Sequence, residues 1–226
     1  NSYRYALPDS VVFAPGTVSV EFKAGTFSDS CGGANDASEQ SFVVSGTTAQ
    51  LLDPSIGVGQ DVVEIAGRTT IDVRFKPTFG RALDTASILD ADAEFMLTLA
   101  TGTVVVVTGV PELVADSIYR YTLPAGTVFP VGEVVVTFIG GSFSDDGGYS
   151  NLETSTGFVV EGPTAKLVDA GAAGLLGVSS LNNRGYLDIT FGATNGNTIS
   201  AASILDGGAE FQLTGGAAAG VAVLNE

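Results

Sequence analysis

Oxygen-bearing side chains gather in two glycine-rich stretches of this sequence, where they could hold a hard cation. The members are Asp29, Asn35, Asp36 and Glu39 in the first stretch, and Asp145, Asp146, Asn151 and Glu153 in the second. Calcium takes about six to eight oxygen ligands from such groups, and its binding relieves the repulsion between neighbouring carboxylates. A second interpretation stays open, because Asp29 and Asp145 could instead accept hydrogen bonds from their own backbone in a solvated turn.

Asp90 and Glu94 form a carboxylate pair of the kind that acts as acid and nucleophile on a glycosidic bond. The run that holds them, ILDADAEF, returns later as ILDGGAEF, and catalytic pairs are seldom duplicated within one short chain. Trp, the residue most often used to stack sugars, is absent. The same two runs also supply a second, smaller cluster of candidate cation ligands, Asp90, Asp92 and Asp206.

The chain contains no His and one Cys, and this composition removes most hydrolytic chemistry. Without His there is no Ser–His or Cys–His pair, and zinc sites built from His and Cys are excluded. The single Cys31 cannot form a disulfide within the chain. We therefore predict that the protein is not an enzyme.

Charge and hydropathy narrow the range of partners and locations. The sequence has 9 Lys and Arg against 25 Asp and Glu, a net charge of −16, so we expect no nucleic-acid binding. No apolar run is long enough to span a bilayer, so we expect no membrane insertion. Scarcity of cysteine is typical of secreted bacterial proteins that lack disulfides, and we predict a secreted, extracellular or cell-surface location.

The sequence repeats itself with a period of 116 residues, the offset between Tyr3 and Tyr119 (119 − 3). Without any gap, about 43 of the 110 aligned residue pairs are identical, far above chance. Both copies are therefore expected to share one fold. The best matches are Tyr3-Arg4-Tyr5 with Tyr119-Arg120-Tyr121, Phe27-Ser28-Asp29 with Phe143-Ser144-Asp145, and Ser87-Ile88-Leu89-Asp90 with Ser203-Ile204-Leu205-Asp206.

Each period contains about seven strand-like runs separated by Gly, Asn, Asp and Pro turns. In the run YLDITF, Leu187, Ile189 and Phe191 point one way and the residues between them the other. The other runs are TAKLVD, AEFQLTG, GVAVLN, AEFMLTL, TVVVVTG, YRYTLP, GEVVVTFIGGSF and TGFVVEG. Seven short strands in one period predict an all-β fold, a sandwich of two antiparallel sheets.

These runs resemble the bacterial immunoglobulin-like repeats of very large secreted or surface-displayed proteins, including adhesins of the RTX type. The resemblance rests on Gly162-Pro163-Thr164-Ala165, on the strand from Arg184 to Phe191, on Tyr119-Arg120-Tyr121, and on the stretch Gly132 to Asn151 ending in GSFSDDGGYSN. A final strand of the SFVV kind completes the family's closing pattern. The resemblance implies tandem immunoglobulin-like β-sandwich units and identifies an architecture more than an activity.

The order of strands in that family also implies where one unit ends and the next begins. A complete unit over residues 47–162 leaves residues 1–46 as the last three strands of one unit and residues 163–226 as the first four strands of another. Half a sandwich exposes apolar faces and unpaired edges. We expect it to find its complement within one chain or head to tail between chains. The alternative is two tandem units, 1–110 and 117–226, joined by VPELVAD.

We therefore expect an extracellular structural repeat protein, a spacer or polymerising scaffold of an adhesin or surface filament, assembled by β-strand complementation. The rival is an adhesin module that binds a cell-surface glycan or protein receptor through exposed tyrosines. Five of the six tyrosines lie in strand-like runs and only Tyr149 lies in a loop, which favours the structural role. Arg4 and Arg120 are expected to pair with carboxylates of a neighbouring strand.

Overall fold

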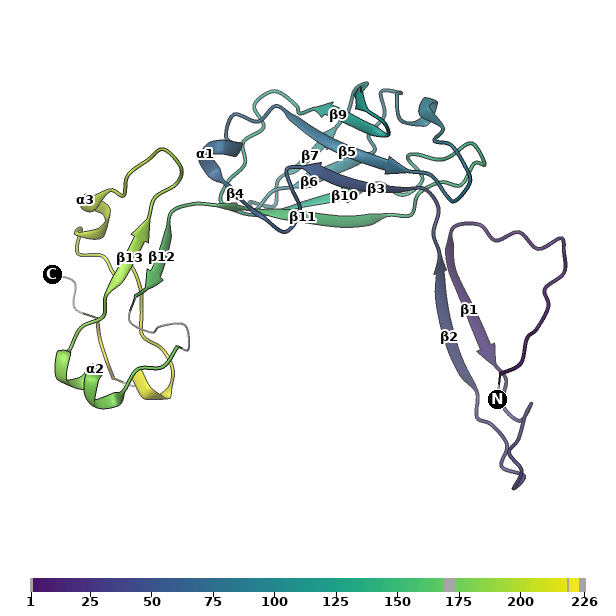
Figure 1. The fold of residues 1–226 in the computed structure, drawn as a ribbon, viewed down its shortest axis with the longest axis horizontal. Helices are drawn as coiled ribbons and strands as arrows, with labels where there is room; N and C mark the ends of the chain where they lie inside the picture. The colour runs from purple at the N-terminus through teal and green to yellow at the C-terminus, as the bar shows by residue number, and fades with distance from the viewer. Residues whose placement is uncertain (1, 169–173, 219, 224–226) are drawn as a thin grey trace. The chain divides into compact units, whose positions relative to one another are not determined.

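The fold is all-β, as the sequence predicts, with many short strands and a few helical turns. The computed structural model describes residues 2–168, 174–218 and 220–223 (Figure 1). By its contacts the chain divides into two compact units, residues 1–60 with 65–160, and residues 61–64 with 161–226. In the described residues no helix is both long and apolar enough to cross a bilayer.

Strands β3 to β11 form a structure that we call the central sandwich. One sheet has the strand order β3-β5-β9-β8, and the other has the order β4-β11-β10-β6-β7. Pairing is antiparallel from β3 to β8 and from β11 to β7. The strands are β3 Thr48–Asp53, β4 Gly59–Asp61, β5 Thr70–Lys76, β6 Phe95–Thr98, β7 Val104–Val107, β8 Glu112–Ala115, β9 Ile118–Thr122, β10 Gly132–Phe138 and β11 Thr154–Glu161.

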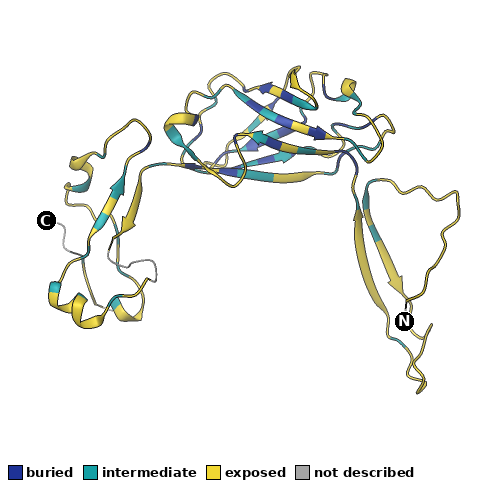
Figure 2. Cartoon of the chain, in the orientation of Figure 1, coloured by how far each residue is buried: buried dark blue, intermediate teal, exposed yellow. Residues whose placement is uncertain are grey.

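Alternation along the strands turns one apolar face of each sheet inward. In β5, Ile71, Val73 and Phe75 are buried, because residues two apart share a face of a strand. The two inner faces meet at aromatic rings: Phe95 of β6 lies edge-on to Tyr121 of β9, with 5.0 Å between ring centroids. Figure 2 shows that the buried residues gather in these strands. The two sheets therefore enclose one hydrophobic core.

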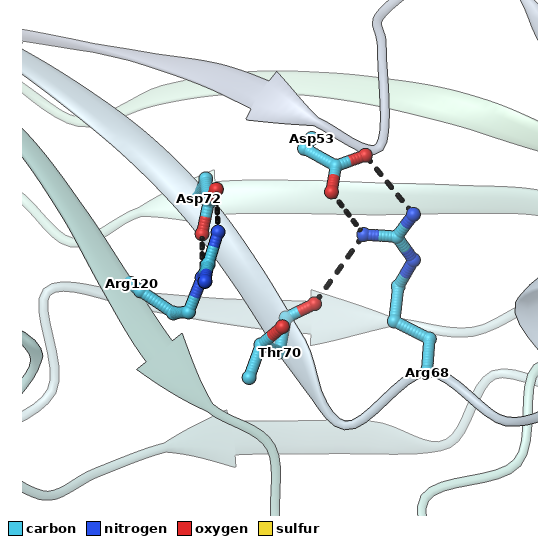
Figure 3. A network of polar contacts seen from close by, with 5 residues as sticks. All are labelled: Asp53, Arg68, Thr70, Asp72 and Arg120. Atoms are coloured by element: carbon cyan, nitrogen blue, oxygen red, sulfur yellow. Dashed lines mark hydrogen bonds and ion pairs between the residues drawn. The ribbon is translucent and has the colours of Figure 1, made fainter. Parts of the chain in front are cut away.

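Two bidentate ion pairs fix the β3-β5-β9 part of the first sheet (Figure 3). Arg120 on β9 faces Asp72 on β5, with Nε–Oδ1 and Nη2–Oδ2 distances of 2.8 Å. Arg68 contacts both oxygens of Asp53, at 2.7 and 3.0 Å. The expectation that Arg120 pairs with a carboxylate of a neighbouring strand is thus confirmed. Such paired charges favour one strand register over its neighbours.

The N-terminal segment, residues 1–46, contains one hairpin. Strands β1, Gly16–Phe22, and β2, Ser38–Val44, pair antiparallel over seven residues. The two strands form a sheet of their own, and most of their residues are exposed. A two-stranded hairpin without a covering layer is marginally stable in water.

The C-terminal segment, residues 163–226, has a second short hairpin and several helical turns. Strand β12, Thr164–Leu167, pairs with β13, Ile189–Gly192.

The sequence analysis assigned no helices, yet short ones lie between strands along the chain. They are α1 Val62–Ile65, η1 Thr85–Ser87, α2 Val178–Arg184, α3 Ala201–Ile204 and η2 Gly216–Ala218.

Several predicted strands do not form in the terminal segments. Residues 209–215 (AEFQLTG) and the described residues 220–223 of GVAVLN carry no strand, and 224–225 lie outside the described residues. Tyr3, Tyr5 and Tyr186 also lie outside strands, so the placement of five tyrosines in strands was wrong. The physical reason is pairing. Residues 209–215 correspond to β6, which is held between β10 and β7, and a strand forms only against a partner.

We expect Phe95→Ala to destabilise the central sandwich by about 3–5 kcal/mol, because it leaves a cavity beneath Tyr121. Urea unfolding followed by circular dichroism would measure the loss. Phe79→Ala is the matched control, since the Phe79 side chain is fully exposed, and it should change stability by less than about 0.5 kcal/mol. Equal effects of the two substitutions would contradict the packing described here.

Candidate self-association surfaces

The two hairpins β1-β2 and β10-β11 are copies of one another in register as well as in sequence. Gly16 lies opposite Val44 in the first, and Gly132 opposite Val160 in the second, 116 residues further on (132 − 16). All seven recorded pairs of the first hairpin recur in the second with this offset. The hairpin of the N-terminal segment therefore has the same strand pairing as β10-β11 in the central sandwich.

The surroundings of the two hairpins differ sharply. In the central sandwich Tyr119 is 2% exposed and Tyr121 is 1% exposed, whereas the equivalent Tyr3 and Tyr5 are 80% and 88% exposed. The same contrast holds for most of the inner face of the segment, with the copies Val18 and Val44 of the buried Val134 and Val160 at intermediate exposure. The exposed members are Leu7, Phe13, Val20, Phe22, Phe27 and Phe42, whose equivalents Leu123, Phe129, Val136, Phe138, Phe143 and Phe158 are buried.

The buried copies show what the exposed copies lack. Phe143 packs edge-on against Phe75 of β5, with 4.7 Å between ring centroids. The ring centroids of Phe75 and Tyr119 are 5.5 Å apart. Each such ring stabilises a fold by about 1.5–3 kcal/mol when it is removed from water. An exposed apolar set of this kind is a candidate interaction surface.

The C-terminal segment repeats the other half of the sandwich. Its pairing of Thr164 with Gly192 matches that of Thr48 with Lys76 in β3 and β5. None of its apolar side chains among the described residues is fully buried. Leu167 is 40% exposed, whereas its equivalent Leu51 is buried. The described side chains of this segment are thus less buried than the equivalent core residues of the central sandwich.

The predicted cation ligands of the second stretch serve mainly as backbone caps. Asp145 is 1% exposed, and its Oδ1 accepts hydrogen bonds from the backbone N–H groups of Gly147 and Tyr149. Its Oδ2 accepts from the backbone N–H and from the hydroxyl of Thr78. Desolvation alone would raise the pKa of Asp145, but these hydrogen bonds together outweigh it and lower the pKa.

Asn151 closes the same loop from its other end. Its side-chain oxygen accepts from the backbone N–H of Phe143, and its amide nitrogen donates to the carbonyls of Ile139 and Leu152. At the surface, Oδ1 of Asp146 lies 4.0 Å from Nη1 of Arg81. Glu153 is exposed. The side-chain oxygens of Asp145 and Asn151 thus already have protein donors.

The first stretch has the same loop, and its hydrogen bonds among the described residues are all local. The Oδ1 atom of Asp29 accepts from the N–H groups of Cys31 and Gly33, and Asn35 caps Thr26 and Phe27. The remaining candidate ligands of this stretch, Asp36 and Glu39, are exposed.

The backbone-capping interpretation of both turns agrees with these contacts. Among the described residues no group of three or more acidic or sulfur ligands converges as a metal site would require. Asp90, Asp92 and Asp206 are among these residues. Calcium binding therefore stays a prediction.

Glu94 is a buried acid whose environment the sequence analysis missed. It is 1% exposed, and neither carboxylate oxygen has a hydrogen-bond partner in the described part of the chain. The Tyr121 hydroxyl, also buried without a hydrogen bond, lies close enough to influence its ionisation. Burial, assisted by the charges of Asp90 and Asp92, raises the pKa of Glu94 to about 7. Its recurrence as Glu210 was the only signal in the sequence.

No protein-family model matches the chain, and no curated protein matches it. The functional assignment therefore depends on the repeat, the two exposed segments and the loop geometry described above.

We expect Asp145→Ala to destabilise the central sandwich by about 2–4 kcal/mol, because its four donors lose their acceptor in a buried position. Asp29→Ala, measured on the monomeric chain, is the matched control, since it removes the two equivalent loop bonds but, among the described residues, no contact to a second element. Urea unfolding of both variants would measure the difference. An effect of Asp29→Ala as large as that of Asp145→Ala would show that the Thr78 contacts contribute nothing.

Glu94 should make the stability of the central sandwich depend on pH. Its pKa in the folded state, about 7, lies above its ordinary value of 4.5, so ionisation opposes folding. The stabilisation by the neutral form is complete below about pH 4.5 and is lost as the pH rises through 7. Glu94→Gln should therefore be more stable than the wild type at pH 8, by up to about 3 kcal/mol.

Thermal melts at several pH values would test this expectation. The difference between Glu94→Gln and the wild type should grow from pH 5 to pH 8 and then level off. The exposed Glu153→Gln is the matched control and should show no such growth. A Glu94→Gln difference that is constant with pH would mean that Glu94 does not titrate in this range.

Proposed function

We propose that this protein is an extracellular structural repeat protein whose immunoglobulin-like units act as a spacer or polymerising scaffold. Its units assemble by β-strand complementation, within an adhesin or a surface filament. The polypeptide supplies sheet faces and edges rather than catalytic groups. Calcium, if it binds, tightens the acidic turns.

The strand order supports the immunoglobulin-like assignment of the central sandwich. When β3, β5, β6, β8, β9, β10 and β11 are lettered A to G in chain order, the two sheets read A-B-E-D and G-F-C. This is the arrangement of immunoglobulin-type sandwiches, with β4 and β7 added at the edges of the second sheet. We accordingly propose unit boundaries at residues 47 and 162, with half-units on either side.

One observation carries the proposal: side chains that form the core of the central sandwich recur, exposed, in the terminal segments. Tyr119 and Tyr121 are core residues, and Tyr3 and Tyr5 are their exposed copies. A binding surface for glycans would require tyrosines that are exposed in the complete unit, and these two are not. The rings of Tyr3 and Tyr5 are better suited to packing inside a completed sandwich than to stacking on a ligand.

Light scattering coupled to size-exclusion chromatography, followed by negative-stain electron microscopy, would test the proposal. The full chain should form threads or oligomers whose size increases with concentration, with and without millimolar calcium. Tyr5→Arg should reduce this association, since it places a charge at a core position of the completed unit. Phe79→Arg is the matched control, because Phe79 is exposed and its equivalent in the repeat is the polar Asn195.

Monomers at every concentration would overturn the assembly part of the proposal. Association that Tyr5→Arg and Phe79→Arg impair equally would show that it does not use the repeated core face. Binding of the wild-type chain to a glycan array, lost on Tyr5→Arg, would favour the rival adhesin role.

A further inference from the structure

We propose that residues 163–226 of one copy of this chain bind residues 1–46 of a second copy in the register of the central sandwich, with Arg4 paired to Asp188. This inference rests on the proposed function and adds to it the partner, a second copy of the chain, and the register of the contact. It predicts which side chains meet across the interface.

The central sandwich supplies the template. Its residues 47–110 pair with residues 117–161 through β5 with β9 and through β6 with β10. The repeat offset carries residues 47–110 onto residues 163–226, and it carries residues 117–162, which end the unit, onto residues 1–46. The pair Ile71 and Tyr121 then becomes Leu187 and Tyr5.

The second sheet follows the same rule. Leu97 lies opposite Val136, and Phe95 lies opposite Phe138. The corresponding pairs between two copies are Leu213 with Val20, and Phe211 with Phe22. Residues 211–214, which carry no strand in the single chain, would gain the partner that β6 finds in β10.

Charge complementarity selects this register. Asp72 lies opposite Arg120 and accepts two hydrogen bonds from it. Their copies are Asp188 and Arg4. Arg4 is exposed, and among the described residues it makes no ion pair. A shift of one residue would move Arg4 to the opposite face of its strand.

A second polar contact is prepared in the same way. Thr78 donates its backbone N–H and its hydroxyl to Oδ2 of Asp145. The copies are Thr194 and Asp29. Asp29 already holds its own loop through Oδ1, and its Oδ2 accepts no hydrogen bond in the described part of the chain. The loop is thus shaped for a donor that comes from a C-terminal segment.

One strand of the central sandwich has no copy, and its position explains why its loss is tolerable. Residues 111–116, which contain β8, are not repeated. β8 is an edge strand and all its residues are exposed. A sandwich formed between two copies would therefore lack this edge strand but keep an apolar residue at the buried apolar positions, except at Leu99, whose copy is Gly215.

Charge reversal in the full chain tests the register. Arg4→Asp and Asp188→Arg should each weaken association about tenfold or more, because each places like charges opposite one another. An equimolar mixture of the two variants should associate again. In the mixture, position 4 of the first variant, now acidic, meets position 188 of the second variant, now basic. The unaltered Asp188 of the first variant meets the unaltered Arg4 of the second. Lys166→Asp is the matched control, since it makes the same change of charge as Arg4→Asp but corresponds to the exposed Gln50.

The outcomes separate the two levels of the proposal. Recovery in the mixture, measured by light scattering, supports the register, and a variant that had merely misfolded would not recover. Wild-type association that neither reversal weakens would overturn the register while leaving the scaffold function intact. A wild-type chain that never associates would overturn both. If mixing fails but the chain carrying both reversals closes as a compact monomer, the partner is the chain's own N-terminal segment.

Discussion

The central sandwich depends on removing two apolar sheet faces from water against each other. The rings of Phe75, Phe95 and Tyr121 meet between the sheets, and the residues that supply them come from both halves of the repeat period. Neither half can bury its own apolar sheet face, because that face is removed from water only when a second layer packs against it. Burial therefore requires that a segment of one kind meet a segment of the other kind, in the same chain or in another.

Polar groups decide which arrangement of those faces is adopted. The bidentate contact of Arg120 with Asp72 is partly exposed, so it adds little free energy, but it discriminates between registers. Asp145 is different, because it is buried and ties its loop to Thr78 through hydrogen bonds that water cannot replace. Ionisation of Glu94, in contrast, lowers the stability of the folded state. The core thus carries one charged group that stabilises it and one that weakens it at neutral pH.

Much of the fold could be predicted from the sequence, because alternation reports directly on strands that are half buried. The all-β class and the strands β10 and β11 follow from it, and the pairing of Arg120 with a carboxylate on a neighbouring strand was also predicted. Residues 209–215 have the same alternation but carry no strand, since a strand needs hydrogen-bond partners that local sequence does not supply. The hydrogen bonds that Thr78 donates to Asp145 could not be predicted either, because the two residues are distant in sequence.

The sequence alone determined that the chain contains two related copies of one repeat, because residue identities at a fixed offset can be counted without coordinates. It also indicated, through a period of two, which residues of a strand share a face. Only the tertiary structure decided that Tyr119 is a core residue and Tyr3 a surface residue. Both are followed by Arg-Tyr in the sequence, and their burial depends on whether a second sheet is present to cover them.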